Sequence, residues 1–120
     1  MSHEKVELFS AITDTMSYTD AGGEQTIYEM VNTTRGIVYG VWLDLVNMTQ
    51  NGTVKVYYKI DGTNYREFKS YSFTVITDSD GLFIPLTLGI TNSLKVTYTE
   101  EVNETAARAI PYSIIYEVRA

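Results

Sequence analysis

The side chains best suited to acid–base or nucleophilic chemistry are scarce in this sequence. His3 is its one histidine, and the 120 residues include no cysteine. A serine or threonine nucleophile needs a nearby base, most often a histidine, and zinc sites are built mainly from cysteine and histidine. We therefore expect no His-based triad, no thiol chemistry, no zinc–thiolate centre and no cofactor, and we predict that the protein is not an enzyme.

Carboxylates are the remaining groups that could act in pairs, as they do in glycosidases. Most of them fall in predicted turns or at predicted strand ends: Asp14, Asp20, Asp61, Asp78, Asp80, Glu100, Glu101 and Glu104. This placement predicts a solvated acidic surface. The segment Thr77–Gly81 partly resembles a calcium loop, but Ile76 and Thr87 stand where an EF-hand places ligands. We expect a tight hairpin there, with a surface calcium site as the alternative.

Asp44 differs from the other acids because it interrupts the apolar run from Gly36 to Val46. A buried carboxylate needs a partner, and Arg35, Arg66 and Arg108 are the candidates. The sequence leaves open an outward-facing residue, a buried ion pair or, as the enzymatic alternative, a carboxylate-based hydrolase that would depend on Asp44.

Aromatic side chains are the other group with a binding capacity. The chain has ten tyrosines and one tryptophan, and an exposed row of such rings could stack on sugars or fill a pocket of a partner. Trp42, Tyr57 and Tyr65 are the members we expect in an interface or ligand platform. A carbohydrate-binding module is therefore one functional hypothesis.

These residues lie on segments with the alternation of β-strands. In Thr53–Ile60, valines 54 and 56, Tyr58 and Ile60 are predicted to face inward, with Lys55, Tyr57 and Lys59 outward. The same pattern recurs in Tyr71–Val75, Asn92–Thr99 and Tyr112–Val118. Further strands are predicted at Val6–Ile12 and Gln25–Val31. The segment Glu100–Ala109 is either a short helical turn or a polar loop.

Two apolar segments complete the predicted sheets. Gly36–Val46 is apolar on both faces, which is typical of a central strand, and Gly40 within it predicts a bulge or a close backbone approach. Pro85 places Gly81–Ile90 at an edge or a bulge. The sequence therefore predicts an all-β, two-sheet antiparallel β-sandwich of about eight strands. We expect a jelly roll rather than an immunoglobulin-like arrangement, in a single domain over residues 1–120 with Met1–Lys5 as an N-terminal arm.

Two stretches of the chain resemble small β-sandwich virion proteins of tailed phages. KVYYKIDGTNYREF, Lys55–Phe68, is similar to a hairpin in which an alternating strand runs into a DGT turn and an aromatic residue follows. RAIPYSIIYEV, Arg108–Val118, is similar to the closing strand of such proteins. The resemblance implies a non-enzymatic capsid decoration or tail component, located in the virion and assembled in the host cytoplasm.

Charge and hydropathy bear on the partners. The formal net charge of −6 argues against nucleic acid, which is bound through Lys and Arg. The apolar runs are shorter than the roughly 20 residues of a membrane helix, and the opening residues lack the apolar core of a signal peptide. We expect a homo-oligomer, a trimer or larger ring, that also binds a larger capsid or tail protein.

Overall fold

The protein is an all-β chain in the computed structural model, which describes residues 9–18, 23–30, 36–75, 81–90, 93–102 and 106–118. The strands are β1 (Phe9–Tyr18), β2 (Gln25–Met30), β3 (Gly36–Leu43), β4 (Gly52–Lys59), β5 (Tyr65–Phe73), β6 (Leu82–Ile90), β7 (Leu94–Glu100) and β8 (Arg108–Val118). Each predicted strand overlaps an observed one, but predicted Val6–Ile12 shares only residues 9–12 with β1 and predicted Tyr71–Val75 shares only residues 71–73 with β5. No helix in the described ranges is long and apolar enough to cross a membrane.

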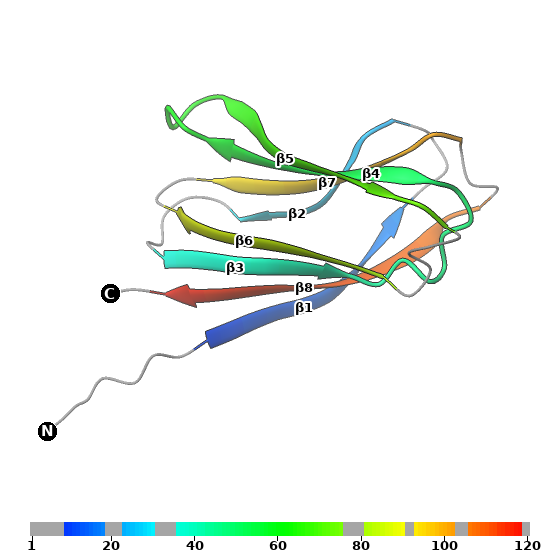
Figure 1. Cartoon of the computed structure of the whole chain (residues 1–120), viewed down its shortest axis with the longest axis horizontal. Coiled ribbons are helices and arrows are strands. Elements are labelled where there is room, and N and C mark those ends of the chain that lie inside the picture. The colour runs from blue at the N-terminus through cyan, green and yellow to red at the C-terminus, as the bar shows by residue number, and fades with distance from the viewer. Residues whose placement is uncertain are drawn as a thin grey trace, which may run out of the picture.

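The strands form two antiparallel sheets of four strands each, ordered β1-β8-β3-β6 and β2-β7-β4-β5. Figure 1 shows the two sheets as the layers of a sandwich. The predicted two-sheet antiparallel sandwich of eight strands is therefore confirmed. Among the described strands, only β4 and β5 are consecutive in the chain and adjacent in a sheet. Because an immunoglobulin sandwich pairs several consecutive strands within one sheet, this order favours the jelly roll.

Apolar side chains from alternate strand positions fill the space between the sheets. The fully buried ones include Val54 and Val56 of β4, Leu94 and Val96 of β7, and Ile110 and Ile114 of β8. At one end of the core, Tyr18 and Tyr98 meet edge to face with ring centroids 5.2 Å apart. The Tyr18 hydroxyl donates a hydrogen bond to the carbonyl oxygen of Gly23 at 3.2 Å, so this buried phenol keeps a polar partner.

A bulge in β3 determines which of its side chains face solvent. The register with β8 passes from Val38↔Tyr116 directly to Gly40↔Ile115, so Tyr39 is an extra residue. Without that residue, strict alternation from buried Val38 would turn Trp42 into the core. With it, Val41 and Leu43 are buried and Trp42 is exposed. The prediction of a bulge or close approach at Gly40 is thus confirmed, as is the edge position of the strand that contains Pro85.

Two predicted details are wrong. Ile60 is 74% exposed, because β4 ends at Lys59 and the turn begins there. Glu100 belongs to β7 and is buried rather than solvated. Glu117 is also buried, and its Oε1 accepts a 2.5 Å hydrogen bond from the hydroxyl of Tyr39, the residue that the bulge inserts.

The connection between β7 and β8 is only partly described. Residues 101, 102, 106 and 107 are not helical, and β8 already starts at Arg108, so the part of Glu100–Ala109 that the structure describes follows the loop interpretation. Several predictions fall outside the described residues: the arm Met1–Lys5 with His3, Arg35, and the acids Asp20, Asp78, Asp80 and Glu104, together with Thr77–Asp80 of the calcium-like segment.

Candidate assembly surfaces

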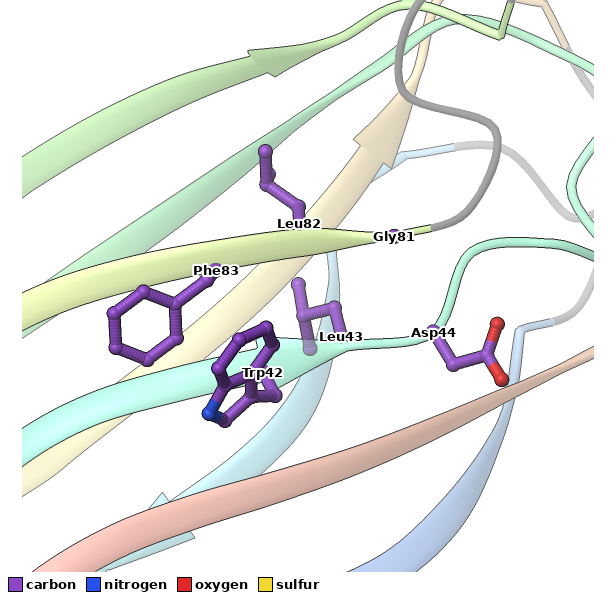
Figure 2. A pocket seen from close by; sticks show the side chains of 6 residues that line it. All are labelled: Trp42, Leu43, Asp44, Gly81, Leu82 and Phe83. Carbon is purple, nitrogen blue, oxygen red and sulfur yellow. The ribbon is translucent and has the colours of Figure 1, made fainter.

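The outer side of the β1-β8-β3-β6 sheet carries an apolar surface, here called the Trp42 face. Trp42 is opposite Phe83 on β6 and Ser113 on β8, and Gly40 is opposite Pro85 and Ile115. Directly opposed residues share a face of the sheet. Trp42 is 51% and Phe83 is 38% exposed, and their ring centroids lie 4.3 Å apart. Figure 2 shows both rings on the same side of the sheet, with Leu43 and Leu82 pointing the other way.

Trp42 stands between two shallow hollows. The larger, about 330 Å³, is lined by Trp42, Leu43, Asp44, Gly81, Leu82 and Phe83. The smaller, about 190 Å³, is lined by Thr13, Trp42, Asp44, Pro111, Tyr112 and Ser113. Tryptophan beside depressions of this kind is common among the residues that contribute most to protein interfaces.

Asp44 borders both hollows and is exposed. It lies just past the end of β3, where its amide donates to the carbonyl oxygen of Pro111 at 2.8 Å. Its Oδ1 accepts the Val46 amide at 3.1 Å, so the carboxylate closes a turn. The outward-facing interpretation of Asp44 is confirmed, and a buried ion pair is excluded by its exposure.

The outer side of the β2-β7-β4-β5 sheet is different because it is covered by charged and hydroxyl groups. Tyr57 of β4 donates from its hydroxyl to Glu24 Oε2 at 2.5 Å, and Thr97 of β7 donates to the same oxygen at 2.5 Å. The hydroxyl of Tyr65 donates to Glu29 Oε2 at 2.6 Å. We call this the Tyr57 face.

Lysines cover the rings of this face. The Lys95 ammonium lies 5.2 Å from the ring centroid of Tyr57 and 4.5 Å from that of Tyr65, and Lys59 lies 4.8 Å from the Tyr65 centroid. These are cation–π distances. A sugar would need to displace the lysines before it could stack on these rings.

The pKa values of this face reflect its hydrogen bonds. Partial burial and the hydrogen bond to Glu24 raise the pKa of Tyr57 to about 12, and burial with the bond to Glu29 raises the pKa of Tyr65 to about 12. For Glu24, burial raises the pKa, but bonds from Thr97 and Tyr57 together with nearby Lys55 and Lys95 outweigh it, so the net direction is downward.

The three predicted platform residues do not come together. Tyr57 and Tyr65 are neighbours, with ring centroids 6.4 Å apart, whereas Trp42 lies on the outer side of the other sheet. Sequence reasoning missed Phe83 as the partner of Trp42, because alternation in Gly81–Ile90 gave its position but not its opposed residue. The signal that was available is Gly40, since the bulge there sets the side on which Trp42 emerges.

No group of three or more His, Cys, Asp or Glu side chains that could hold a metal ion occurs among the described residues. The carboxylate of Asp61 is instead hydrogen-bonded by groups of its own turn. Its Oδ1 accepts the amides of Thr63 and Asn64, both at 2.8 Å. These bonds hold the pKa of Asp61 at about 2.

Comparison with known proteins shows which structures have a similar fold. No family model and no curated protein matches the sequence. A chain of the acidic-stable capsid of Helicobacter pylori bacteriophage KHP30 superimposes with a TM-score of 0.59 at 13% identity, covering 96% of this chain and 95% of that one. A chain of the cyanophage Pam1 capsid asymmetric unit gives 0.54 at 17% identity, over 99% and 91%.

A third similar structure comes from the disulfide-linked pili of Bacillus endospore appendages, with a TM-score of 0.54 at 15% identity, covering 100% of this chain and 96% of that one. At such identities the likeness concerns the fold. The chain thus has the β-sandwich fold found in phage capsid and pilus proteins, and its resemblance to phage virion proteins is confirmed at that level.

Proposed function

We propose that this protein is a non-enzymatic structural component of a phage virion, a capsid decoration or tail protein with a jelly-roll fold. The observation that carries the proposal is the Trp42 face. It exposes a tryptophan and a phenylalanine side by side on the rigid strands β3 and β6. Exposed aromatic pairs of this kind are enriched at the centres of protein interfaces.

The distribution of charge indicates which kind of surface the Trp42 face would bind. Asp44 is the one exposed charged side chain described at the Trp42 face, whereas the Tyr57 face carries Lys55, Lys59, Lys95, Glu24, Glu29 and Glu67. Burying the Trp42 face therefore desolvates little charge. We infer that it docks on an apolar surface of a larger capsid or tail protein, and that the charged Tyr57 face stays toward solvent.

A pilus subunit is the nearest competing assembly. The Bacillus appendages are described as disulfide-linked pili, but the present chain has no cysteine with which to form such links. Electron microscopy separates the two assemblies, since isolated protein that forms long fibres without shells would favour the pilus.

The carbohydrate-binding alternative loses most of its platform in this fold. Lysines cover Tyr57 and Tyr65, and Trp42 lies on another face. A glycan array together with Trp42 fluorescence tests it, and specific sugar binding that quenches Trp42 would support it against the structural role.

The direct test of the proposed function is binding to virions. The chain should be found by mass spectrometry in purified phage particles of its source, and purified protein should rebind shells from which it has been stripped. Trp42→Ser should lose rebinding in cosedimentation. Tyr57→Ser, a matched aromatic truncation on the opposite face, should bind like the wild type. Absence from particles, or equal loss in both variants, contradicts the proposal.

A further inference from the structure

Four of the described strands lie at sheet edges, and three of them carry features that discourage pairing with another chain. Strand β5 contains Arg66, Glu67 and Lys69. Strand β2 has six residues and an irregular register, and β6 contains Pro85 next to a register shift. Charges, short length, proline and bulges are the devices that protect natural sheet edges.

Strand β1 has none of these devices except for a single charge. Its ten residues pair with β8 in unbroken register, from Phe9↔Glu117 to Tyr18↔Arg108. It contains no proline, and Asp14 is its one charged residue. Among the described strands β8 is its only sheet neighbour, and Figure 1 shows the first part of β1 at the lower border of the molecule.

The direction of the β1 amides follows from two hydrogen bonds. The carbonyl of Pro111, the residue opposite Thr15, points to the β3 side of β8, where it accepts the Asp44 amide. Because N–H and C=O of one strand residue point the same way, Pro111 and Thr15 form a non-hydrogen-bonded pair. The Thr15 amide therefore points away from the sheet, and the Asp14 side chain accepts it at 2.8 Å.

Alternation then assigns the outward amides to residues 9, 11, 13, 15 and 17. We propose that β1 pairs antiparallel with β1 of a second copy, about a two-fold axis at Thr13, and joins the two β1-β8-β3-β6 sheets into one. In this register residue 11 faces residue 15 of the other copy and residue 9 faces residue 17. All five outward amides then find carbonyls, which is the self-complementarity that a two-fold contact requires.

The two-fold register and the low charge of β1 itself favour a second copy as the occupant. The net charge of −6 makes two copies repel each other overall, but β1 brings only one carboxylate from each copy to the contact. With the axis at Thr13, Asp14 faces Ile12 of the second copy rather than its Asp14. The Asp14 carboxylate competes with this pairing, because it must release the Thr15 amide before that amide can donate to a carbonyl of the second copy.

Sedimentation equilibrium over a concentration series measures this association. Thr13→Pro removes the central outward amide and is sterically allowed at an edge, whereas Thr13→Ala keeps the amide and removes the same hydroxyl. As its concentration increases, the wild-type protein should change from a monomer to a dimer. Thr13→Pro should raise the dimer dissociation constant on the order of 100-fold, for two lost hydrogen bonds, and Thr13→Ala should match the wild type. Asp14→Ala should dimerise about tenfold more tightly.

Thermal unfolding checks that each variant folds. If Thr13→Pro does not fold, the comparison of Ser17→Pro with Ser17→Ala replaces it. A monomer at every concentration, a trimer, or a dimer unaffected by both proline variants overturns the inference. The inference concerns the backbone edge of β1, which borders the Trp42 face at Thr13, so variants away from Thr13 test it separately from the proposed function. Trp42→Ser should leave the dimer intact, and Ser17→Pro, at a residue that lines neither hollow of the Trp42 face, should still bind shells, with lower avidity.

Discussion

At the residue scale, Gly52 shows how closely the core is packed around Tyr98. A Cβ at position 52 would lie 2.5 Å from the Tyr98 hydroxyl oxygen and 2.8 Å from the Thr99 carbonyl oxygen. Tyr98 is fully buried, so its ring has no free space into which it could move. Strand β4 therefore depends on glycine at its first position.

We predict that Gly52→Ala lowers the free energy of unfolding by about 1–3 kcal/mol, the usual cost of overpacking. Gly40→Ala is the matched control, because its Cβ would meet mainly the ring of Phe83, which is partly exposed and can move aside. Urea unfolding measures both, and Gly40→Ala should cost less while changing Trp42 fluorescence. Equal costs would contradict this account of Gly52.

A second residue-scale prediction concerns Tyr57 and Tyr65. Their pKa values of about 12 lie above the value of about 10 for free tyrosine. The contribution of these hydroxyls to stability is thus fully present below pH 10 and is lost as the pH rises toward 12. Ultraviolet titration should show late-ionising tyrosines that include Tyr57 and Tyr65, and Tyr57→Phe should remove one of them. Ionisation of both at pH 10 would contradict the hydrogen bonds to Glu24 and Glu29.

At the scale of the element, the β4–β5 hairpin is closed by its turn. Gly62 has φ of 80°, which glycine tolerates without strain, and Asp61 binds the two amides that follow it. The cross-strand pair of Lys55 and Glu67, with Nζ and Oε1 3.6 Å apart, adds little because it is exposed.

We predict that Asp61→Ala speeds amide hydrogen exchange at Thr63 and Asn64, and that Asp61→Asn, which keeps an acceptor oxygen, has a smaller effect. Because folding lowers the pKa of Asp61 to about 2, its contribution is complete above a pH of about 4 and is lost as the pH falls through 2. Exchange that is insensitive to both variants would show that the glycine alone sets the turn.

At the scale of the whole molecule, charge is segregated between two outer faces. The Tyr57 face carries lysines and glutamates in contact with each other, and the Trp42 face and the β1 edge carry almost none. Contacts through the Trp42 face and the β1 edge therefore contain few ion pairs that salt could weaken. The overall negative charge of each copy opposes their association.

Added salt should consequently tighten the dimer of the wild-type protein modestly, because it screens the repulsion between two chains of charge −6. Sedimentation equilibrium at low salt and at about 1 M NaCl, where screening acts over roughly 3 Å, provides the measurement. A dimer that dissociates as salt increases would instead place ion pairs at the contact.

The sequence by itself determined the fold class and most strand positions. Period-two alternation in segments such as Thr53–Ile60 depends only on which side chains avoid water, and turn residues such as Asp61 and Gly62 mark the strand ends. The lack of cysteine and the single histidine likewise limit the chemistry open to the chain, whatever its fold, because a side chain that is missing cannot be supplied by packing.

Only the tertiary structure decided how the strands pair and which residues share a surface. Trp42 faces solvent because of one inserted residue, Tyr39, whose effect depends on its register with β8. The inserted Tyr39 also donates its hydroxyl hydrogen bond to buried Glu117. Trp42 and Tyr57 looked equivalent in the sequence, but they occupy opposite outer faces because β3 and β4 belong to different sheets. Pairing between distant strands is a long-range property, and local patterns of hydropathy do not encode it.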